Sequence, residues 1–108
     1  MGLDAAIYND DEEEEEIASV CLGNVSMIGY LRDAISVTVP DASVLIHKVL
    51  YSGSHGGDSL SREEVRLAKL ELEKVATQLP RDVDVQDFIS AFGNLMDVAL
   101  VRNRPITF

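Results

Sequence analysis

Cysteine is scarce in this sequence, and its scarcity limits both the chemistry and the cellular compartment. Among the 108 residues, Cys21 is the only cysteine. One thiol can form no disulfide within the chain and has no second thiol for a metal site, so we expect a protein of the reducing cytoplasm. Cys21 lies among alternating apolar residues, where buried structural cysteines are common. We therefore expect it to be buried and not to act as a nucleophile, which needs an electropositive setting.

Long hydrophobic runs are also missing. The uninterrupted apolar stretches are short, as at Val44-Leu45-Ile46, whereas a membrane-spanning helix needs roughly 20 apolar residues. The first residues lack the basic and apolar regions of a secretory signal, and Ala6 stands where a myristoylation motif requires serine or threonine. These absences predict a cytoplasmic protein without a membrane partner.

Basic residues are few. The chain has 9 lysines and arginines against 19 aspartates and glutamates, which gives a formal net charge of −10. Nucleic-acid binding depends on patches of lysine and arginine that contact phosphates, and the sequence lacks such patches. We therefore expect no nucleic-acid partner. An acidic protein favours basic partners, and charge complementarity speeds their encounter.

The residues that are present suffice for one folded domain. A chain of 108 residues has a common size for a single domain and buries about two-thirds of its unfolded surface. Hydrophobic residues make up 46% and charged residues 26%, which is the balance of a globular protein. We expect one domain over residues 1–108.

The N-terminal part predicts two strands separated by an acidic run. Leu3 to Tyr8 and Ile17 to Leu22 are short segments of clustered or alternating apolar residues. Between them, residues 10–16 are seven consecutive carboxylates, which repel one another and oppose compact packing. We therefore expect the connection at 10–16 to project into solvent and to be mobile.

The next part predicts a helix and then an ambiguous segment. Asn24 is a good N-cap, and apolar residues recur every three or four positions until Pro40 ends the segment. Residues 42–51 fit either a buried strand or a helical stripe, because short apolar runs are not resolved by periodicity. We favour a strand. Residues 52–59, rich in glycine and serine, predict a loop.

Two further helices have defined start signals. Ser61 and Glu64 form a capping box, and the apolar stripe that follows ends at Pro80. Asp82 or Asp84 can cap a last helix with a broad apolar face. The residues that should face the core are Val65, Ala68, Leu72, Val75, Ala76 and Leu79 in the first helix and Val85, Phe88, Ile89, Phe92, Leu95, Met96, Ala99 and Leu100 in the second.

The last residues complete the predicted fold. Gly93 costs about 1 kcal/mol in a helix relative to alanine, so we expect it to permit close packing against a neighbouring element. Pro105 must end the last helix, which leaves residues 106–108 as a short strand-forming tail. The sequence predicts an α+β domain with a small antiparallel or mixed sheet packed against about three helices. We expect the N-terminal strands, with the 42–51 segment, to form that sheet.

Residues suited to catalysis or metal binding form no recognised pattern. His47, His55 and Asp58 are the candidates, but no cysteine joins them at metal-ligand spacing. The glycines after His55 lack the Gly-Lys-Ser/Thr ending of a phosphate-binding loop. Glu71 and the other glutamates of the capped helix lie on its charged face, where we expect ordinary solvated residues. We expect no catalytic residue, no metal, no cofactor and no enzymatic activity.

The acidic run has two interpretations. It is either a solvated loop that aids solubility or a docking surface for lysine and arginine of a partner protein. Under the second interpretation, the loop residues His55 and Asp58 join the run as partner-binding residues. The set that we expect is Asp10, Asp11, Glu12, Glu13, Glu14, Glu15, Glu16, His55 and Asp58.

Several short strings follow one another along most of the chain in a recognisable order. They are Met1-Gly2-Leu3, the acidic run, Tyr30-Leu31-Arg32-Asp33, His55-Gly56-Gly57-Asp58, the Ser61 capping box and Pro105-Ile106-Thr107-Phe108. In these strings the chain resembles the immunity proteins of bacterial polymorphic toxin systems, in particular the family numbered seventy. The resemblance implies a cytoplasmic protein that binds and neutralises a cognate toxin. A basic nuclease toxin would suit the acidic composition.

Two other functions stay open at the level of sequence. A small regulatory or scaffold domain could form a homodimer through an apolar helix face that folding leaves exposed. A small hydrolase or metal enzyme could use His55 and Asp58.

Overall fold

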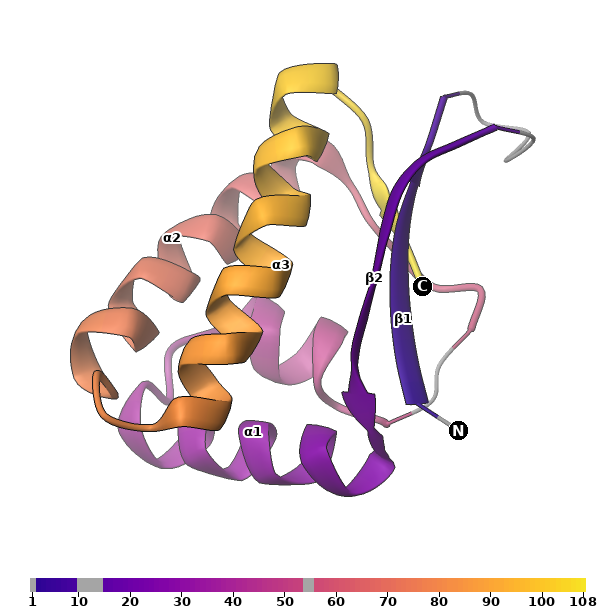
Figure 1. The fold of residues 1–108 in the computed structure, drawn as a ribbon. Helices are drawn as coiled ribbons and strands as arrows, with labels where there is room; N and C mark the ends of the chain where they lie inside the picture. The colour runs from indigo at the N-terminus through magenta and orange to yellow at the C-terminus, as the bar shows by residue number, and fades with distance from the viewer. Residues whose placement is uncertain (1, 10–14, 54–55) are drawn as a thin grey trace.

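A single β-sheet with helices on one side makes up the fold (Figure 1). The computed structural model describes residues 2–9, 15–53 and 56–108. Three long helices and one short helical turn pack against the same side of the sheet. The predicted α+β class is therefore confirmed, with an antiparallel sheet and about three helices.

The sheet has four strands in the order β2-β1-β4-β3, and each neighbouring pair is antiparallel. The predicted N-terminal strands are β1 (Gly2–Tyr8) and β2 (Glu16–Asn24), which form a hairpin. The predicted C-terminal strand is β4 (Ile106–Thr107), and it lies between β1 and β3 (Ser59–Leu60). The sequence does not predict β3, because two residues are too few to show alternation.

Two β-bulges bend β2. The pairing register with β1 passes over Ile17 and over Leu22, so each is the extra residue of a bulge. Gly23 follows the second bulge with a φ of 142°, and a Cβ there would lie 2.9 Å from Cγ of Met27. Only glycine adopts this backbone conformation without strain. Between the bulges, residues 18–21 pair regularly with β1.

Helix α1 (Val25–Thr38) begins and ends where the sequence predicts. The side-chain oxygen of Asn24 accepts a hydrogen bond from the backbone N–H of Met27 at 2.8 Å, which is an N-cap. The helix ends shortly before Pro40, since the residue before a proline avoids the helical conformation. Its buried residues are Ile28, Leu31 and Ile35.

Helix α2 (Arg62–Gln78) carries the predicted capping box. The hydroxyl of Ser61 accepts from the backbone N–H of Glu64 at 3.2 Å, and the carboxylate of Glu64 accepts from the N–H of Ser61 at 3.0 Å. Lys48 also contacts Glu64, with Nζ 2.7 Å from Oε2. The Lys48 hydrogen bond, and next the backbone N–H of Ser61, lower the pKa of Glu64.

Helix α3 (Val83–Arg102) is capped by Asp82, whose carboxylate accepts from the N–H of Val85 at 3.1 Å. An added Cβ at Gly93 would lie 3.4 Å from Cδ2 of Leu72 on α2. The two helices therefore approach closely at this glycine, as predicted.

The strand predicted at 42–51 is wrong, because residues 43–49 of this segment are helical and include a π-helical turn, η1 (Leu45–Val49). The N–H groups of Val44 and Leu45 donate to the carboxylate of Glu71 at 3.2 and 2.9 Å. Glu71 is thus not an ordinary solvated residue: from α2 it satisfies free N–H groups at the start of the turn. The apolar residues of the segment recur at helical spacing, and Leu45, Ile46, Val49 and Leu50 are buried.

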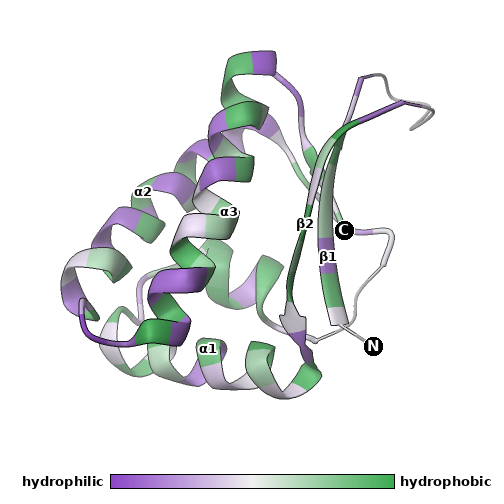
Figure 2. Cartoon of the chain, in the orientation of Figure 1, coloured by the Kyte–Doolittle hydropathy of each residue, from purple (hydrophilic) through white to green (hydrophobic). Residues whose placement is uncertain are grey.

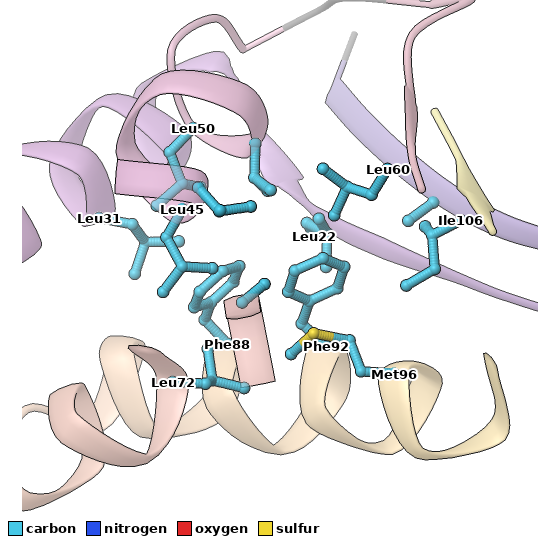
Figure 3. Close-up of a cluster of buried hydrophobic side chains, with 14 of the residues drawn as sticks. Leu22, Leu31, Leu45, Leu50, Leu60, Leu72, Phe88, Phe92, Met96 and Ile106 are labelled. Carbon is cyan, nitrogen blue, oxygen red and sulfur yellow. The ribbon is translucent and has the colours of Figure 1, made fainter. Parts of the chain in front are cut away.

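One hydrophobic core fills the space between the sheet and the helices (Figure 3). The rings of Phe88 and Phe92 stack, with their centroids 5.6 Å apart. The ring of Phe92 also packs against that of Phe108, and these two centroids are 6.4 Å apart. Figure 2 shows hydrophilic residues alternating with hydrophobic ones along α2 and α3, as amphipathic helices require. The largest fully buried side chains are Phe92, Leu3, Ile7, Ile28, Leu31, Ile35, Leu45, Leu50, Leu60, Leu72, Met96 and Ile106.

Candidate functional site

One face of the sheet is left uncovered by the helices (Figure 1). Along β1, the side chains of Leu3, Ala5 and Ile7 are buried against the helices, so Asp4 and Ala6 between them point the other way; Asp4 is exposed and Ala6 is buried. The pairing register identifies their neighbours on the other strands. We call this surface the outer face; its residues are Asp4, Ala6, Tyr8, Glu16, Ser19, Cys21, Ser59 and Thr107.

Small side chains cross the middle of the outer face. Ser19 lies opposite Ala6, Ala6 opposite Thr107, and Thr107 opposite Ser59. A hollow of about 550 Å³ lies over β1, β2 and β4, with Tyr8 at its border. The hollow is open to solvent and offers hydroxyl groups at its floor, so it suits a side chain of another protein.

The hollow is acidic. Exposed Asp4 and Glu16 contribute to its lining, and the residues described there include no lysine, arginine or histidine. The three lysines of the chain lie on the helical side in ion pairs. These pairs are Lys48 with Glu64 at 2.7 Å, Lys69 with Asp97 at 2.9 Å and Lys74 with Asp41 at 2.9 Å. Lysine thus compensates carboxylates of the helical side, not those of the outer face.

The last two residues of the acidic run, Glu15 and Glu16, lie at one end of the outer face. The N–H of Asn9 donates to the carbonyl of Glu15 at 2.7 Å and so closes the hairpin. Glu15 and Glu16 are exposed, and Glu16 belongs to β2, not to the connection predicted at 10–16. From the helical side, Nε of Arg104 donates to the carbonyl of Tyr8 at 2.9 Å. The other predicted site residues of the run, Asp10, Asp11, Glu12, Glu13 and Glu14, lie outside the described residues.

Asp58 is built into the fold and does not lie beside the hairpin end. Its carboxylate accepts a hydrogen bond from the hydroxyl of Tyr51, which raises the pKa of Tyr51. Its backbone carbonyl accepts from the N–H of Phe108 at 2.8 Å, next to the pairing of β3 with β4. Figure 1 shows the 56–58 segment well below the hairpin end. The structure therefore separates Asp58 from Glu15 and Glu16, and His55 lies outside the described residues.

Cys21 is exposed on the outer face, so the expectation that it is buried is wrong. Alternation along β2 gives the inner side to its neighbour Leu22, which is buried. The residue opposite Cys21 on β1 is Asp4. A carboxylate does not provide the electropositive setting that activates a thiol.

Within residues 2–9, 15–53 and 56–108, no group of three or more histidine, cysteine, aspartate or glutamate side chains could hold a metal ion. In the same part of the chain, the helices are too short or too polar to cross a membrane. Comparisons with protein-family models, curated proteins and solved structures found no match to this chain. The resemblance to immunity proteins therefore stays a prediction.

Sequence reasoning missed the outer face as a site, although its signal is present. In β1, Asp4 and Tyr8 alternate with the apolar residues Leu3, Ala5 and Ile7 at a period of two, which is interrupted by Ala6, because Ala6 is also apolar. This period of two marks one solvent-facing side of a strand. What the pattern does not tell is whether a helix covers that side.

Proposed function

We propose that this protein is an immunity-type inhibitor that binds a basic toxin protein and blocks its active site. The observation that carries the proposal is the acidic outer face. Asp4, Glu15 and Glu16 are exposed on it or at its end, and the residues described around its hollow include no basic side chain. Residues 10–14 add five carboxylates to the same hairpin in the sequence. The resemblance to immunity proteins of polymorphic toxin systems supports a toxin as the partner.

Inhibition of this kind needs a complementary surface and no chemistry. A nuclease toxin contacts phosphates through clustered lysine and arginine, and carboxylates can take the place of those phosphates. Charge complementarity raises the association rate, while close packing around a few desolvated side chains sets the lifetime of the complex. We expect a partner side chain to enter the hollow over Ala6, where the floor is made of small residues. The bound inhibitor then excludes the substrate sterically.

The test begins with the basic protein that copurifies with the tagged chain from its source cells. Its toxic activity should disappear when an equimolar amount of this chain is added, and its expression should be tolerated only together with this chain. A captured protein whose activity is unchanged at equimolar inhibitor would contradict the proposal. Recovery of only this chain, with a dimer in sedimentation, would instead favour the homodimeric scaffold.

Charge-neutralised variants then test the outer face. We expect the outer-face variant to bind the toxin about tenfold more weakly at low salt, because exposed complementary charges mainly affect association. The matched control removes the same number of exposed carboxylates from the helices and should bind like the unmodified chain. The outer-face variant is Asp4→Asn, Glu15→Gln and Glu16→Gln; the control is Asp33→Asn, Glu63→Gln and Glu73→Gln. Equal weakening by both would show that net charge, not the outer face, determines binding.

A further inference from the structure

Among the described residues, no strand pairs with the outer edge of β2. β2 stands at one end of the strand order, and among the described residues its pairing partner is β1. Alternate residues of an antiparallel strand direct their N–H and C=O groups away from the paired neighbour. The bulges at Ile17 and Leu22 interrupt pairing at both ends of this edge, as protected edge strands often do. Residues 18–21 between them stay regular and offer backbone groups to another strand.

A groove runs between this edge and α3. It has a volume of about 300 Å³ and lies directly beside residues 18–20 of β2. Its floor is apolar, because small side chains of β2 and α3 meet there. The lining residues that matter here are Ala18, Val20, Ala91, Asn94, Leu95 and Val98. Neighbouring strands lie about 4.7–4.9 Å apart, so a strand added to β2 would run along this groove.

The net charge of the chain selects the occupant of the groove. Among the described residues, the lining carries no charged side chain. Along α3, acidic Asp87 lies one helical turn before Ala91 and basic Arg102 lies one turn after Val98, while Glu16 at the start of β2 belongs to the outer face. All three are exposed. A second copy of this chain, with a net charge of −10, would be repelled, whereas a segment with basic residues and small apolar residues would be attracted.

We infer that the free edge of β2 binds an extended basic segment of the partner protein, which joins the sheet as a fifth strand. Backbone hydrogen bonds to residues 18–21 would provide affinity, and alternate side chains in the groove would provide specificity. The other side chains of the segment would continue the outer face next to Ser19 and Cys21. This inference rests on the proposed function, because it specifies how the basic partner is held.

The probe is a synthetic eight-residue peptide in which lysine alternates with valine, added to the full isotopically labelled chain. We expect chemical-shift changes at residues 18–21 and slower exchange of those amides among them that face away from β1, together with shift changes at Ala91 and Val98. The same peptide with an N-methyl group on every residue keeps its charge but cannot donate backbone hydrogen bonds along either edge, so it should bind about tenfold more weakly. Binding of both peptides within twofold would overturn the fifth-strand inference.

Two variants carry the test to the toxin complex. Ala91→Arg fills the groove and adds a positive charge, so we expect toxin binding to weaken about tenfold. Val37→Arg makes the same kind of change at a residue that is 85% exposed near the far end of α1, and it should have no effect. Thermal melts confirm that both variants fold.

Toxin binding that Ala91→Arg leaves unchanged would reject the fifth strand and leave the proposed function intact. Concentration-dependent protection of residues 18–21 in the chain alone would show that a second copy fills the edge, and this too would overturn the inference. Failure of the proposed function would look different, because no basic protein would then be inhibited at all.

Discussion

Glu71 illustrates how a single side chain of this protein depends on its tertiary surroundings. In the sequence it is one of several glutamates on the polar side of an amphipathic helix. In the structure its carboxylate accepts from two backbone N–H groups, at 3.2 and 2.9 Å, in a part-buried position. A hydrogen bond to a charged group contributes more than one between neutral groups. Glu71 therefore contributes to the helical conformation of the 42–51 segment.

Replacing Glu71 with alanine should lower the free energy of unfolding by about 1–3 kcal/mol, because two N–H groups lose their acceptors. Urea unfolding followed by circular dichroism measures this change. Glu73→Ala is the control, since Glu73 is exposed on the same helix and its replacement should change stability by less than about 0.5 kcal/mol. Equal losses in the two variants would mean that the hydrogen bonds of Glu71 are not the cause.

The contact of Glu64 with Lys48 makes stability depend on pH. The pKa of Glu64 is lowered in the folded protein, first by Lys48 and then by the backbone N–H of Ser61. A lowered folded-state pKa gives stability that is present above the unfolded value, about 4.3, and is lost as the pH falls through the folded value. We expect the free energy of unfolding to fall in acid.

Glu64→Gln tests this dependence, because glutamine can stay in the capping box but carries no charge for Lys48. Urea titrations between about pH 7 and about pH 3 should show that the free energy of unfolding decreases less toward acid pH in this variant than in the unmodified chain. The remaining loss belongs to carboxylates such as Asp41, whose pKa is lowered by the Lys74 hydrogen bond. If the free energy of unfolding depended on pH equally in the two proteins below about pH 5, the prediction would be contradicted.

At the scale of elements, each long helix carries its own start signal next to it in the sequence. Asn24, Ser61 and Asp82 accept hydrogen bonds at the first turns of α1, α2 and α3. Such local signals are readable without knowledge of the fold. The packing of one helix against another depends on residues that are far apart in the sequence. Gly93 of α3 is a position where α2 and α3 lie close together.

Substitutions at Gly93 should change stability in opposite directions, according to the size of the new side chain. Alanine would place its Cβ 3.4 Å from Cδ2 of Leu72 and 3.6 Å from Nζ of Lys69, which are ordinary contacts. Gly93→Ala should therefore raise the free energy of unfolding by up to about 1 kcal/mol through helix propensity. Gly93→Leu should lower it by about 1–3 kcal/mol, because the added atoms would push the helices apart. Thermal denaturation of both variants measures the sign of each change, and a destabilising alanine would contradict the prediction.

At the scale of the whole molecule, the two ends of the chain meet in the sheet. β4 pairs with β1 through Thr107 and Ala6, and with β3 through Ile106 and Leu60. β4 is a central strand of two residues, so the connection between β1 and β3 depends on few contacts. The paired residues are far apart in the sequence, so bringing them together costs loop-closure entropy. Burial of Ile106 helps to offset that cost.

Ile106→Ala should lower the free energy of unfolding by about 2–5 kcal/mol, because it leaves a cavity under a central strand. That is a large part of the roughly 5–15 kcal/mol that stabilises a domain. Urea unfolding measures the loss, and amide exchange should rise in β3 and β4 together. The control Val101→Ala, at a residue that is 84% exposed, should change stability by less than about 0.5 kcal/mol. Loss of less than about 1 kcal/mol in Ile106→Ala would contradict the central position of β4.

The candidate site could be predicted from the sequence only in part. The acidic run and the two strands that flank it follow from the composition and the alternation of residues 3–22. The position of Asp58 could not be predicted, because it depends on pairing between β3 and β4. Neither could the exposure of Cys21, since alternation alone does not say which side of a strand the helices cover.

The sequence by itself determined the elements whose causes are local: the caps of three helices, their apolar stripes, the proline stops and the α+β class. Tertiary structure alone decided the helical state of 42–51, the strand β3 and the free edge of β2. The physical reason is the range of the interactions. A cap forms within four residues, whereas Glu71 reaches η1 from 26 and 27 positions away, and β3 is a strand only because β4 lies beside it.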